Sequence, residues 1–313
     1  MEVLSLSLPF FGLILLGWAS AKATSYGEEG LKWMSFFIIY IALPALFFQL
    51  IRKTPLEELA NPGFIIGTSG STLAIFLSTY LFGRYFSRNT NTESTMQAVA
   101  GSYSNIGYMG PGLTLAAFGE AVVVPTALVF CFDNALLFTL TPLFVELGKQ
   151  REHHIGAVLL QAVKKVLLHP FILATIAGIL ASAIHFEPPQ FIENILNLLK
   201  GAAAPCALFV LGVVIAGRKA HLNSIDIPVT LLIKLLLHPL LVYLLLSWIG
   251  NIPPIWLYTG VLMSALPPAL NVFILAQQYD AFIEQASSIV LIGTIIAVFT
   301  VTALLYAIQY GWI

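Results

Sequence analysis

An apolar segment from residue 96 to residue 118 is interrupted by the stretch Ser104-Asn105-Ile106-Gly107-Tyr108-Met109-Gly110-Pro111-Gly112. Three glycines and one proline fall within six of these residues. They cannot sustain a continuous helix, because proline lacks a backbone N–H and glycine has a low helix propensity. The segment is therefore expected to be a helix that is broken near its middle.

A second break lies in the apolar segment 255–278, which contains Ala265-Leu266-Pro267-Pro268-Ala269-Leu270-Asn271. Two adjacent prolines remove two backbone donors and clash with the preceding turn. Unpaired N–H and C=O groups in hydrocarbon cost several kcal/mol each, so irregular backbone at membrane depth survives only where it lines a cavity or packs inside protein. The two breaks therefore predict an internal cavity.

The composition indicates that the solvent of this chain is a lipid bilayer. Of 313 residues, 58% are apolar and only 9% are charged, against about 25% charged residues in soluble domains. A net charge of −1 gives no reason to expect a nucleic-acid partner. A spanning helix needs about 20 residues, and ten apolar segments fit this length, at 3–21, 33–50, 63–83, 96–118, 122–147, 164–184, 192–217, 228–249, 255–278 and 285–309. The predicted fold class is an all-α polytopic membrane protein.

The orientation follows from the positive residues in the connections. If the N-terminus is outside, the cytoplasmic connections hold ten Lys and Arg residues, and the outer ones hold only Arg52 and Lys53. Lys and Arg accumulate on the cytoplasmic side of membrane proteins. Both termini are therefore expected to face outward, in a bacterial inner membrane or a plasma membrane.

The chain contains a weak internal repeat. A shift of 161 residues brings identical residues together in the first, second and fifth spans of each half, for example Pro9 with Pro170, Gly17 with Gly178, Pro44 with Pro205, Phe48 with Phe209 and Phe138 with Phe299. The same shift places Gly107 on Pro268 and Gly110 on Asn271, so the two breaks correspond.

Each half has five spans, so the second half must enter the membrane from the opposite side. Such inverted repeats are typical of secondary transporters, whose binding sites lie at paired helix breaks. We expect a first repeat at 1–147, a cytoplasmic linker at 148–163 and a second, inverted repeat at 164–313, with helices four and nine broken.

The residues at the breaks form a candidate anion site. Half-helix N-termini direct partial positive charge at an anion, and the amides of Asn105 and Asn271 can donate to a carboxylate. The same amides can instead cap the opened backbone, and both roles can hold together. The candidate substrate-binding residues are Asn105, Gly107, Pro111, Pro267, Pro268 and Asn271.

A charged pair is the candidate for ion coupling. Asp133 lies near the middle of the fifth span, where a charge costs roughly 2.5–3.5 kcal/mol. Lys234, in the eighth span, has a stem long enough to reach toward it. One hypothesis is an ion pair that opens when a proton or cation binds, and the alternative is a static structural pair.

An enzymatic reading is disfavoured. Gly67-Thr68-Ser69-Gly70 matches the G-x-S-G of intramembrane serine proteases, but this chemistry needs a histidine base at the same depth. His169 and His238 lack a supporting motif, and a small-residue packing face explains the glycines. No catalytic residue, metal site or cofactor is expected.

The chain resembles the auxin efflux carrier family over its whole length. The marks of the resemblance are Leu43-Pro44-Ala45-Leu46-Phe47, Ser104-Asn105-x-Gly107-Tyr108-x-Gly110, Pro205-x-x-Leu208-Phe209-x-Leu211-Gly212 and Ala265-x-Pro267-x-x-x-Asn271-x-x-x-x-Ala276-x-x-Tyr279. The family usually has a spacer before the proline of span four, whereas Gly110 and Pro111 are adjacent here.

The resemblance implies a dimer-forming scaffold of helices one, two, six and seven, and a moving domain of helices three to five and eight to ten. It implies carboxylate substrates such as auxin, malonate or malate. Asn105 and Asn271 would be the carboxylate-binding pair, and Pro111, Pro267 and Pro268 would form the crossing. Asp133 and Lys234 resemble the acidic and basic pair of sodium–proton antiporters.

We therefore expect a homodimeric secondary transporter that moves small organic anions across the lipid bilayer by alternating access, with proton or sodium coupling left open. Two alternatives remain. One is a sodium-coupled symporter of sterol-like organic acids, and the other is a membrane sensor that binds an anion without transporting it.

Overall fold

A computed structural model describes residues 2–24, 29–53, 61–148, 167–217 and 224–313, together with a few single positions between 156 and 164. Most of the linker expected at 148–163 lies outside the described residues. Within them every extended regular element is a helix, and one isolated antiparallel bridge joins Ser104 to Pro268. The all-helical prediction is confirmed for this part of the chain.

The α-helices follow one another as α1 (Glu2–Ala23), α2 (Glu29–Phe37), α3 (Leu43–Arg52), α4 (Pro62–Tyr85), α5 (Asn91–Ser102), α6 (Gly110–Phe118), α7 (Val123–Leu147), α9 (Pro170–Ala183), α10 (Gln190–Ala216), α11 (Asp226–Leu232), α12 (His238–Ile249), α13 (Pro254–Ala265), α14 (Leu270–Gln278) and α15 (Ile283–Gln309). Two π-helical segments continue the chain between helices, η1 (Ile38–Ala42) from α2 to α3 and η4 (Ile233–Leu237) from α11 to α12. A 3₁₀ turn, η3 (Glu120–Val122), precedes α7.

Six helices of the described chain are long and apolar enough to cross a membrane. They are Gly30–Arg52, Pro62–Tyr85, Glu120–Leu147, Gln190–Ala216, Asp226–Ile249 and Ile283–Gln309. Each contains or largely overlaps one of the spans expected from the sequence. Two shorter apolar helices, Leu8–Ala23 and Ile172–Ala183, fall on expected spans one and six. The protein is therefore a multi-pass membrane protein.

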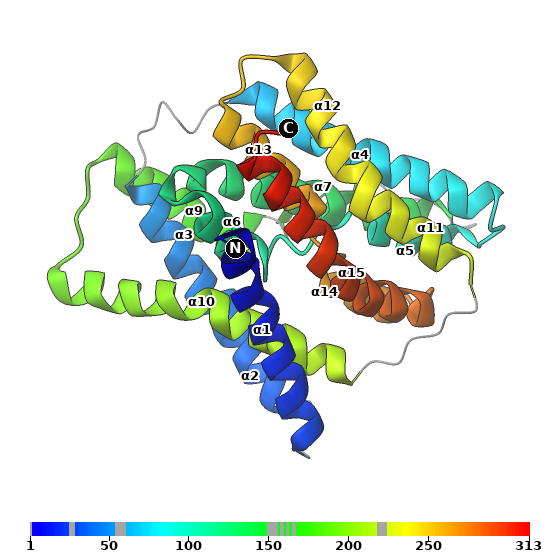
Figure 1. The fold of residues 1–313 in the computed structure, drawn as a ribbon, viewed down its shortest axis with the longest axis horizontal. Helices are drawn as coiled ribbons and strands as arrows, with labels where there is room; N and C mark the ends of the chain where they lie inside the picture. Colours follow the sequence, from blue (N-terminus) through cyan, green and yellow to red (C-terminus); the bar gives the residue numbers. More distant parts are fainter. Residues whose placement is uncertain are drawn as a thin grey trace.

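The helices form two groups, and packing is much more extensive within each group than between them. In the α1/α10 group (α1, α2, α3, α9 and α10), α1 packs along α10 and α3 along α9. In the α4/α12 group (α4 to α7 and α11 to α15), α4 packs on α5 and α12, and α12 packs on α13. Figure 1 shows α1, α2 and α10 at the lower left, and α4, α11 and α12 along the upper right.

Within the α1/α10 group, α1 and α10 touch backbone to backbone at two glycines. A Cβ added at Gly17 would lie 2.1 Å from the carbonyl oxygen of Phe209. A Cβ added at Gly212 would lie 1.9 Å from the carbonyl oxygen of Ile14. Only glycine permits this approach, because any side chain would overlap the facing backbone.

The contact between α9 and α3 has a glycine at the corresponding place. A Cβ at Gly178 would lie 3.1 Å from the carbonyl oxygen of Phe48. Gly17 and Gly178 correspond under the 161-residue shift, as do Phe209 and Phe48. The two helix pairs thus use equivalent positions of the two halves of the sequence.

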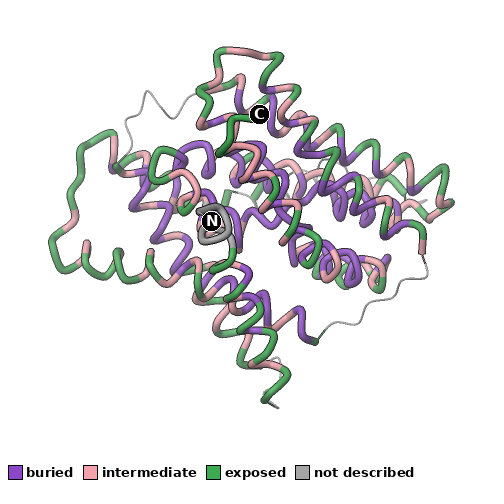
Figure 2. The backbone as a smooth tube through the Cα atoms, in the orientation of Figure 1, coloured by how far each residue is buried: buried purple, intermediate pink, exposed green. Residues whose placement is uncertain are grey.

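Burial sets the two interrupted segments apart from the other helices. Residues 94–106 and 259–270 are buried without exception, with no exposed stripe. A helix that is buried on all sides is surrounded by protein. Elsewhere large apolar side chains point outward, as at Leu180, Leu198 and Trp248, which suits contact with lipid. Figure 2 shows this buried interior between outer helices that carry the exposed positions.

Candidate functional site

The two breaks meet in the interior and satisfy each other's backbone. The backbone N–H of Asn105 donates to the carbonyl of Pro267 over 2.8 Å, and that of Ala269 donates to the carbonyl of Tyr103 over 2.9 Å. These bonds flank the bridge between Ser104 and Pro268. Polar groups that a continuous helix would have paired internally are thereby satisfied by the other segment.

Local sequence explains where each half-helix restarts. The carbonyl of Asn105 accepts from the backbone N–H groups of Met109 and Gly110, at 3.1 and 3.2 Å, and this turn leads into α6. Pro111 occupies the first turn of α6, where its missing N–H costs nothing. At the other break, α14 starts after extended Ala269 without a side-chain cap, and the backbone N–H of Val272 donates to the carbonyl of Ala269 over 3.1 Å.

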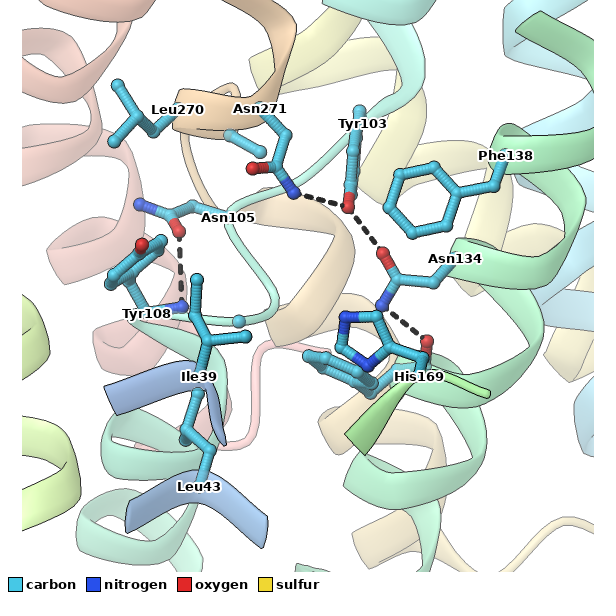
Figure 3. A pocket seen from close by; sticks show the side chains of 13 residues that line it. Ile39, Leu43, Tyr103, Asn105, Tyr108, Asn134, Phe138, His169, Leu270 and Asn271 are labelled. Atoms are coloured by element: carbon cyan, nitrogen blue, oxygen red, sulfur yellow. Dashed lines mark hydrogen bonds between the residues drawn. The ribbon is translucent and has the colours of Figure 1, made fainter. Parts of the chain in front are cut away.

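A small cavity of about 60 Å³ lies beside the meeting point (Figure 3). Its polar lining comes from Tyr103, Asn105, Tyr108, Asn134, His169 and Asn271. Its apolar walls come from Ile39, Leu43, Phe130, Phe138 and Leu270, among others. Ile39, Leu43 and His169 belong to the α1/α10 group or its edge, whereas the remaining residues belong to the α4/α12 group. The cavity therefore lies between the two groups.

A directed chain of hydrogen bonds runs along one side of the cavity. The amide nitrogen of Asn271 donates to the phenol oxygen of Tyr103 over 2.9 Å, and this phenol donates to the side-chain oxygen of Asn134. The amide nitrogen of Asn134 then donates to the carbonyl of Phe130 over 2.7 Å. Figure 3 shows these three side chains in line. The chain fixes the amide of Asn271 so that its nitrogen is a donor at the cavity.

Asn105 presents a buried donor that has no acceptor in the part of the chain that the structure describes. The backbone N–H of Tyr108 donates to the Asn105 side-chain oxygen over 3.3 Å, which turns the amide nitrogen the other way, as Figure 3 shows. Asn105 is only 1% exposed, and its Nδ2 has no hydrogen-bond partner in the described structure. A buried donor left unpaired costs roughly 1–3 kcal/mol. The site therefore suits a ligand that brings acceptor oxygens.

The six predicted substrate residues all lie at the two breaks, but they do different things. Asn105, Gly107 and Asn271 line the cavity. Pro111, Pro267 and Pro268 are not among its lining residues and instead shape the backbone around it. Pro268 packs so closely on α15 that a Cβ at Gly293 would lie 2.7 Å from its Cδ.

Four polar lining residues were not expected from the sequence as ligand-binding groups. Tyr103 directly precedes the first break and Asn134 directly follows Asp133, so their positions gave a signal that could have found them. Tyr108 belongs to the first break itself. His169 precedes α9, far along the chain from both breaks, so nothing in the sequence indicated that it lies at the cavity.

Asp133 and Lys234 do not form the direct ion pair that the sequence suggested. Both oxygens of Asp133 accept hydroxyl donors, from Ser69 at 3.1 Å and from Thr72 at 2.9 Å. The ammonium of Lys234 donates to the carbonyl of Ser264 over 2.5 Å instead. The hydroxyls of α4 occupy both oxygens of the Asp133 carboxylate. Intervening side chains therefore separate this carboxylate from the Lys234 ammonium.

Ser69 is not placed as a protease nucleophile. Its hydroxyl donates to Asp133 rather than to an imidazole. Activation of a serine requires a base that takes its proton, and the observed partner is a carboxylate that also binds Thr72.

Buried polar residues inside apolar helices mark a pathway through a membrane protein. Comparison of the sequence with known proteins places this protein among the membrane transporters. A family model described as "Membrane transport protein" matches residues 3–305. The chain belongs to this family, the auxin efflux carrier family, and the resemblance seen in the sequence is confirmed.

Relatives are found in bacteria and plants. A protein of Rhizobium meliloti (strain 1021) named "Putative malonate transporter" is 46% identical over 310 residues, which are 99% of this chain and 97% of the relative. The "Uncharacterized transporter YfdV" of Escherichia coli (strain K12) is 24% identical and covers 90% of both chains. "Auxin efflux carrier component 8" of Arabidopsis thaliana is 27% identical over 47% of this chain and 41% of its own length.

Proposed function

We propose that this transporter carries small organic carboxylates across a cell membrane by alternating access. The observation that carries the proposal is the buried amide nitrogen of Asn105, which finds no acceptor among the described residues and lies at the cavity between the two breaks. A carboxylate supplies the acceptor that this donor lacks.

The character of the cavity supports a substrate of low charge. Its described lining contains no Lys or Arg, so attraction comes from amide and phenol donors and from the N-terminus of α14. Such dipoles suit one or two carboxylates better than a multiply charged phosphate ester. A volume of about 60 Å³ also favours a short acid.

The relative named as a malonate transporter, at 46% identity over nearly the whole chain, makes malonate the first substrate to test. Malonate is a short dicarboxylate, and its carboxylate oxygens can accept from the amide and phenol donors of the cavity. Auxin-like acids carry a bulky ring and are the less favoured candidates.

Movement of the two helix groups against each other would provide alternating access. The cavity lies between them, and their contacts with each other are sparse. The equivalent glycine contacts of Gly17 and Gly178 support the division into two inverted repeats of five spans, with the broken helices crossing where α5–α6 meets α13–α14. With ten spans both termini would lie on the same side, which the positive residues of the connections predict to be the outside, and the α1/α10 group would form the homodimer contact.

Transport can be tested with labelled malonate in liposomes that carry the purified protein. We expect saturable uptake, which Asn105→Ala and Asn271→Ala reduce strongly. Asn194→Ala is the matched control, because Asn194 is an exposed residue of α10 away from the cavity and its loss should leave uptake unchanged.

The same assay separates the alternatives. Binding of malonate without flux would favour the membrane sensor. Flux that requires an imposed sodium gradient, with sterol-like acids preferred over malonate, would favour the sodium-coupled symporter. Neither binding nor flux of short carboxylates by folded protein would contradict the proposal.

A further inference from the structure

Four polar side chains connect α7, α4 and the α11–α12 span in an unbroken series. The hydroxyl oxygen of Thr72 lies 2.9 Å from an Asp133 carboxylate oxygen and 3.3 Å from Nε2 of His238. Nδ1 of His238 lies 3.3 Å from the ammonium nitrogen of Lys234. The series thus begins at a buried cation and ends at a buried carboxylate.

All four side chains are withdrawn from solvent. Lys234 and His238 are 0% exposed, Thr72 is 1% exposed and Asp133 is 5% exposed. Unpaired buried charges are very costly, so each ion needs the hydrogen bonds of the residues between them. Lys234 lies in the π-helical segment η4, an irregularity that frequently occurs at functional sites.

The directions of these hydrogen bonds follow from the chemistry of the groups. An ammonium only donates, so Nδ1 of His238 must accept from Lys234. In a neutral imidazole the proton is then on Nε2, which donates to the Thr72 oxygen. Thr72 has a single proton, and it donates that proton to Asp133. Every donor in the series therefore points from Lys234 toward Asp133.

We propose that Thr72 and His238 form a proton relay through which Lys234 protonates Asp133 when an anion occupies the cavity. This inference rests on the proposed transport of carboxylates. An N–H bond of Lys234 breaks as Nδ1–H forms, Nε2–H breaks as a new O–H forms on Thr72, and the former Thr72 proton moves to Asp133. The products are a neutral amine, a neutral imidazole with its proton on Nδ1, a threonine hydroxyl and a carboxylic acid.

The anion supplies the driving force for this transfer. Asp133 directly precedes Asn134, which lines the cavity, so an anion there is repelled by the Asp133 carboxylate. The transfer neutralises both Lys234 and Asp133, which removes the repulsion from the carboxylate and leaves the net charge of the protein unchanged. Two groups outside the relay contact its ends: the hydroxyl of Ser69 donates to Asp133, and the carbonyl of Ser264 accepts from Lys234.

The histidine tautomer provides a direct test. Protein labelled with ¹⁵N-histidine is placed in lipid nanodiscs, and the His238 signal is assigned by its loss in H238Q. We expect the proton on Nε2 without ligand and on Nδ1 at saturating malonate. An unchanged tautomer, with malonate binding shown by calorimetry, would overturn the relay while leaving the transport proposal intact. Absence of malonate binding would count against both proposals.

A pair of substitutions on one helix provides a second test. Thr72→Val keeps the shape but removes the relay hydroxyl, so malonate uptake should fall about tenfold or more and malonate should no longer shift the His238 tautomer. Thr79→Val is the matched control, because Thr79 is also a buried threonine of α4, but its hydroxyl has no hydrogen-bond partner among the described residues. A ligand-induced tautomer shift that persists in Thr72→Val would refute the relay.

Discussion

The phenol of Tyr103 and the amide of Asn271 are hydrogen-bonded over 2.9 Å although 168 residues separate them in the chain. The bond joins the first helix break to the start of α14, and through Asn134 it extends to α7. One hydroxyl therefore orients two amides at the candidate site.

Removal of that hydroxyl should weaken anion binding. Tyr103→Phe leaves the Asn271 donor and the Asn134 acceptor without their partner, and an unsatisfied buried group costs roughly 1–3 kcal/mol. We expect malonate affinity to fall on the order of tenfold, as measured by calorimetry. Tyr40→Phe is the control, because Tyr40 is exposed at 54% of its surface. Equal affinities for both variants would show that Tyr103 does not organise the site.

A charge at Asn105 should act more strongly than loss of its amide. Asn105→Asp places a carboxylate where the structure holds a buried donor, and like charges at close range repel a carboxylate substrate. Uptake of malonate should be lower than in Asn105→Ala at neutral pH. Acidic medium should restore part of the uptake, because a protonated carboxyl donates a hydrogen bond. If Asn105→Asp transports better than Asn105→Ala at neutral pH, the carboxylate of the substrate does not bind beside residue 105.

His169 should distinguish dicarboxylates from monocarboxylates. Among the described cavity-lining residues it is the one imidazole, whose ring N–H can donate a hydrogen bond to the second carboxylate of a dicarboxylate. His169→Gln should weaken malonate binding on the order of tenfold and acetate binding by less than about twofold, in competition assays. His185→Asn, at an exposed position with φ of 50°, is the control. If His169→Gln weakened the binding of malonate and of acetate equally, His169 would have a structural role and would not select between the two acids.

The contact between α1 and α10 should not tolerate a methyl group. Gly17→Ala and Gly212→Ala would place a Cβ against facing backbone, and backbone cannot yield as a flexible side chain does. Overpacking typically costs about 1–3 kcal/mol, so the melting temperature in detergent should fall for each variant. Gly12→Ala in the same helix has open space within 4 Å and should melt like the wild type. If Gly17→Ala and Gly212→Ala melted at the same temperature as Gly12→Ala, the close approach of the α1 and α10 backbones would be contradicted.

The sequence was sufficient to predict where the two helices break, because proline and glycine act through local backbone geometry. Gly107, Pro111 and Pro267 each mark a place where helical hydrogen bonding must stop. The amides beside the breaks, Asn105 and Asn271, could be identified for the same reason, and the structure brings both to one cavity.

The partners of those amides could not be predicted, because they depend on how helices pack across long stretches of sequence. Opposite charge alone suggested that Asp133 and Lys234 meet, yet Thr72 and His238 lie between them. The position of His238 four residues after Lys234 places both on one helix face, which was a usable signal. The hydroxyls of α4 gave no such signal in the sequence, since threonine is common in packed helices.

The hydrogen bonds between the breaks have a consequence for membrane insertion. Ser104 donates to the carbonyl of Ser264, 160 residues later in the chain, and Asn105 and Tyr103 pair with residues of the same later segment. While the ribosome is still completing the second half, these groups have no partner in hydrocarbon, where each would cost several kcal/mol. The first break must therefore stay in contact with water, the translocation machinery or other protein until the second arrives. A nascent chain truncated before residue 264 should consequently be recognised by membrane quality control as unfinished.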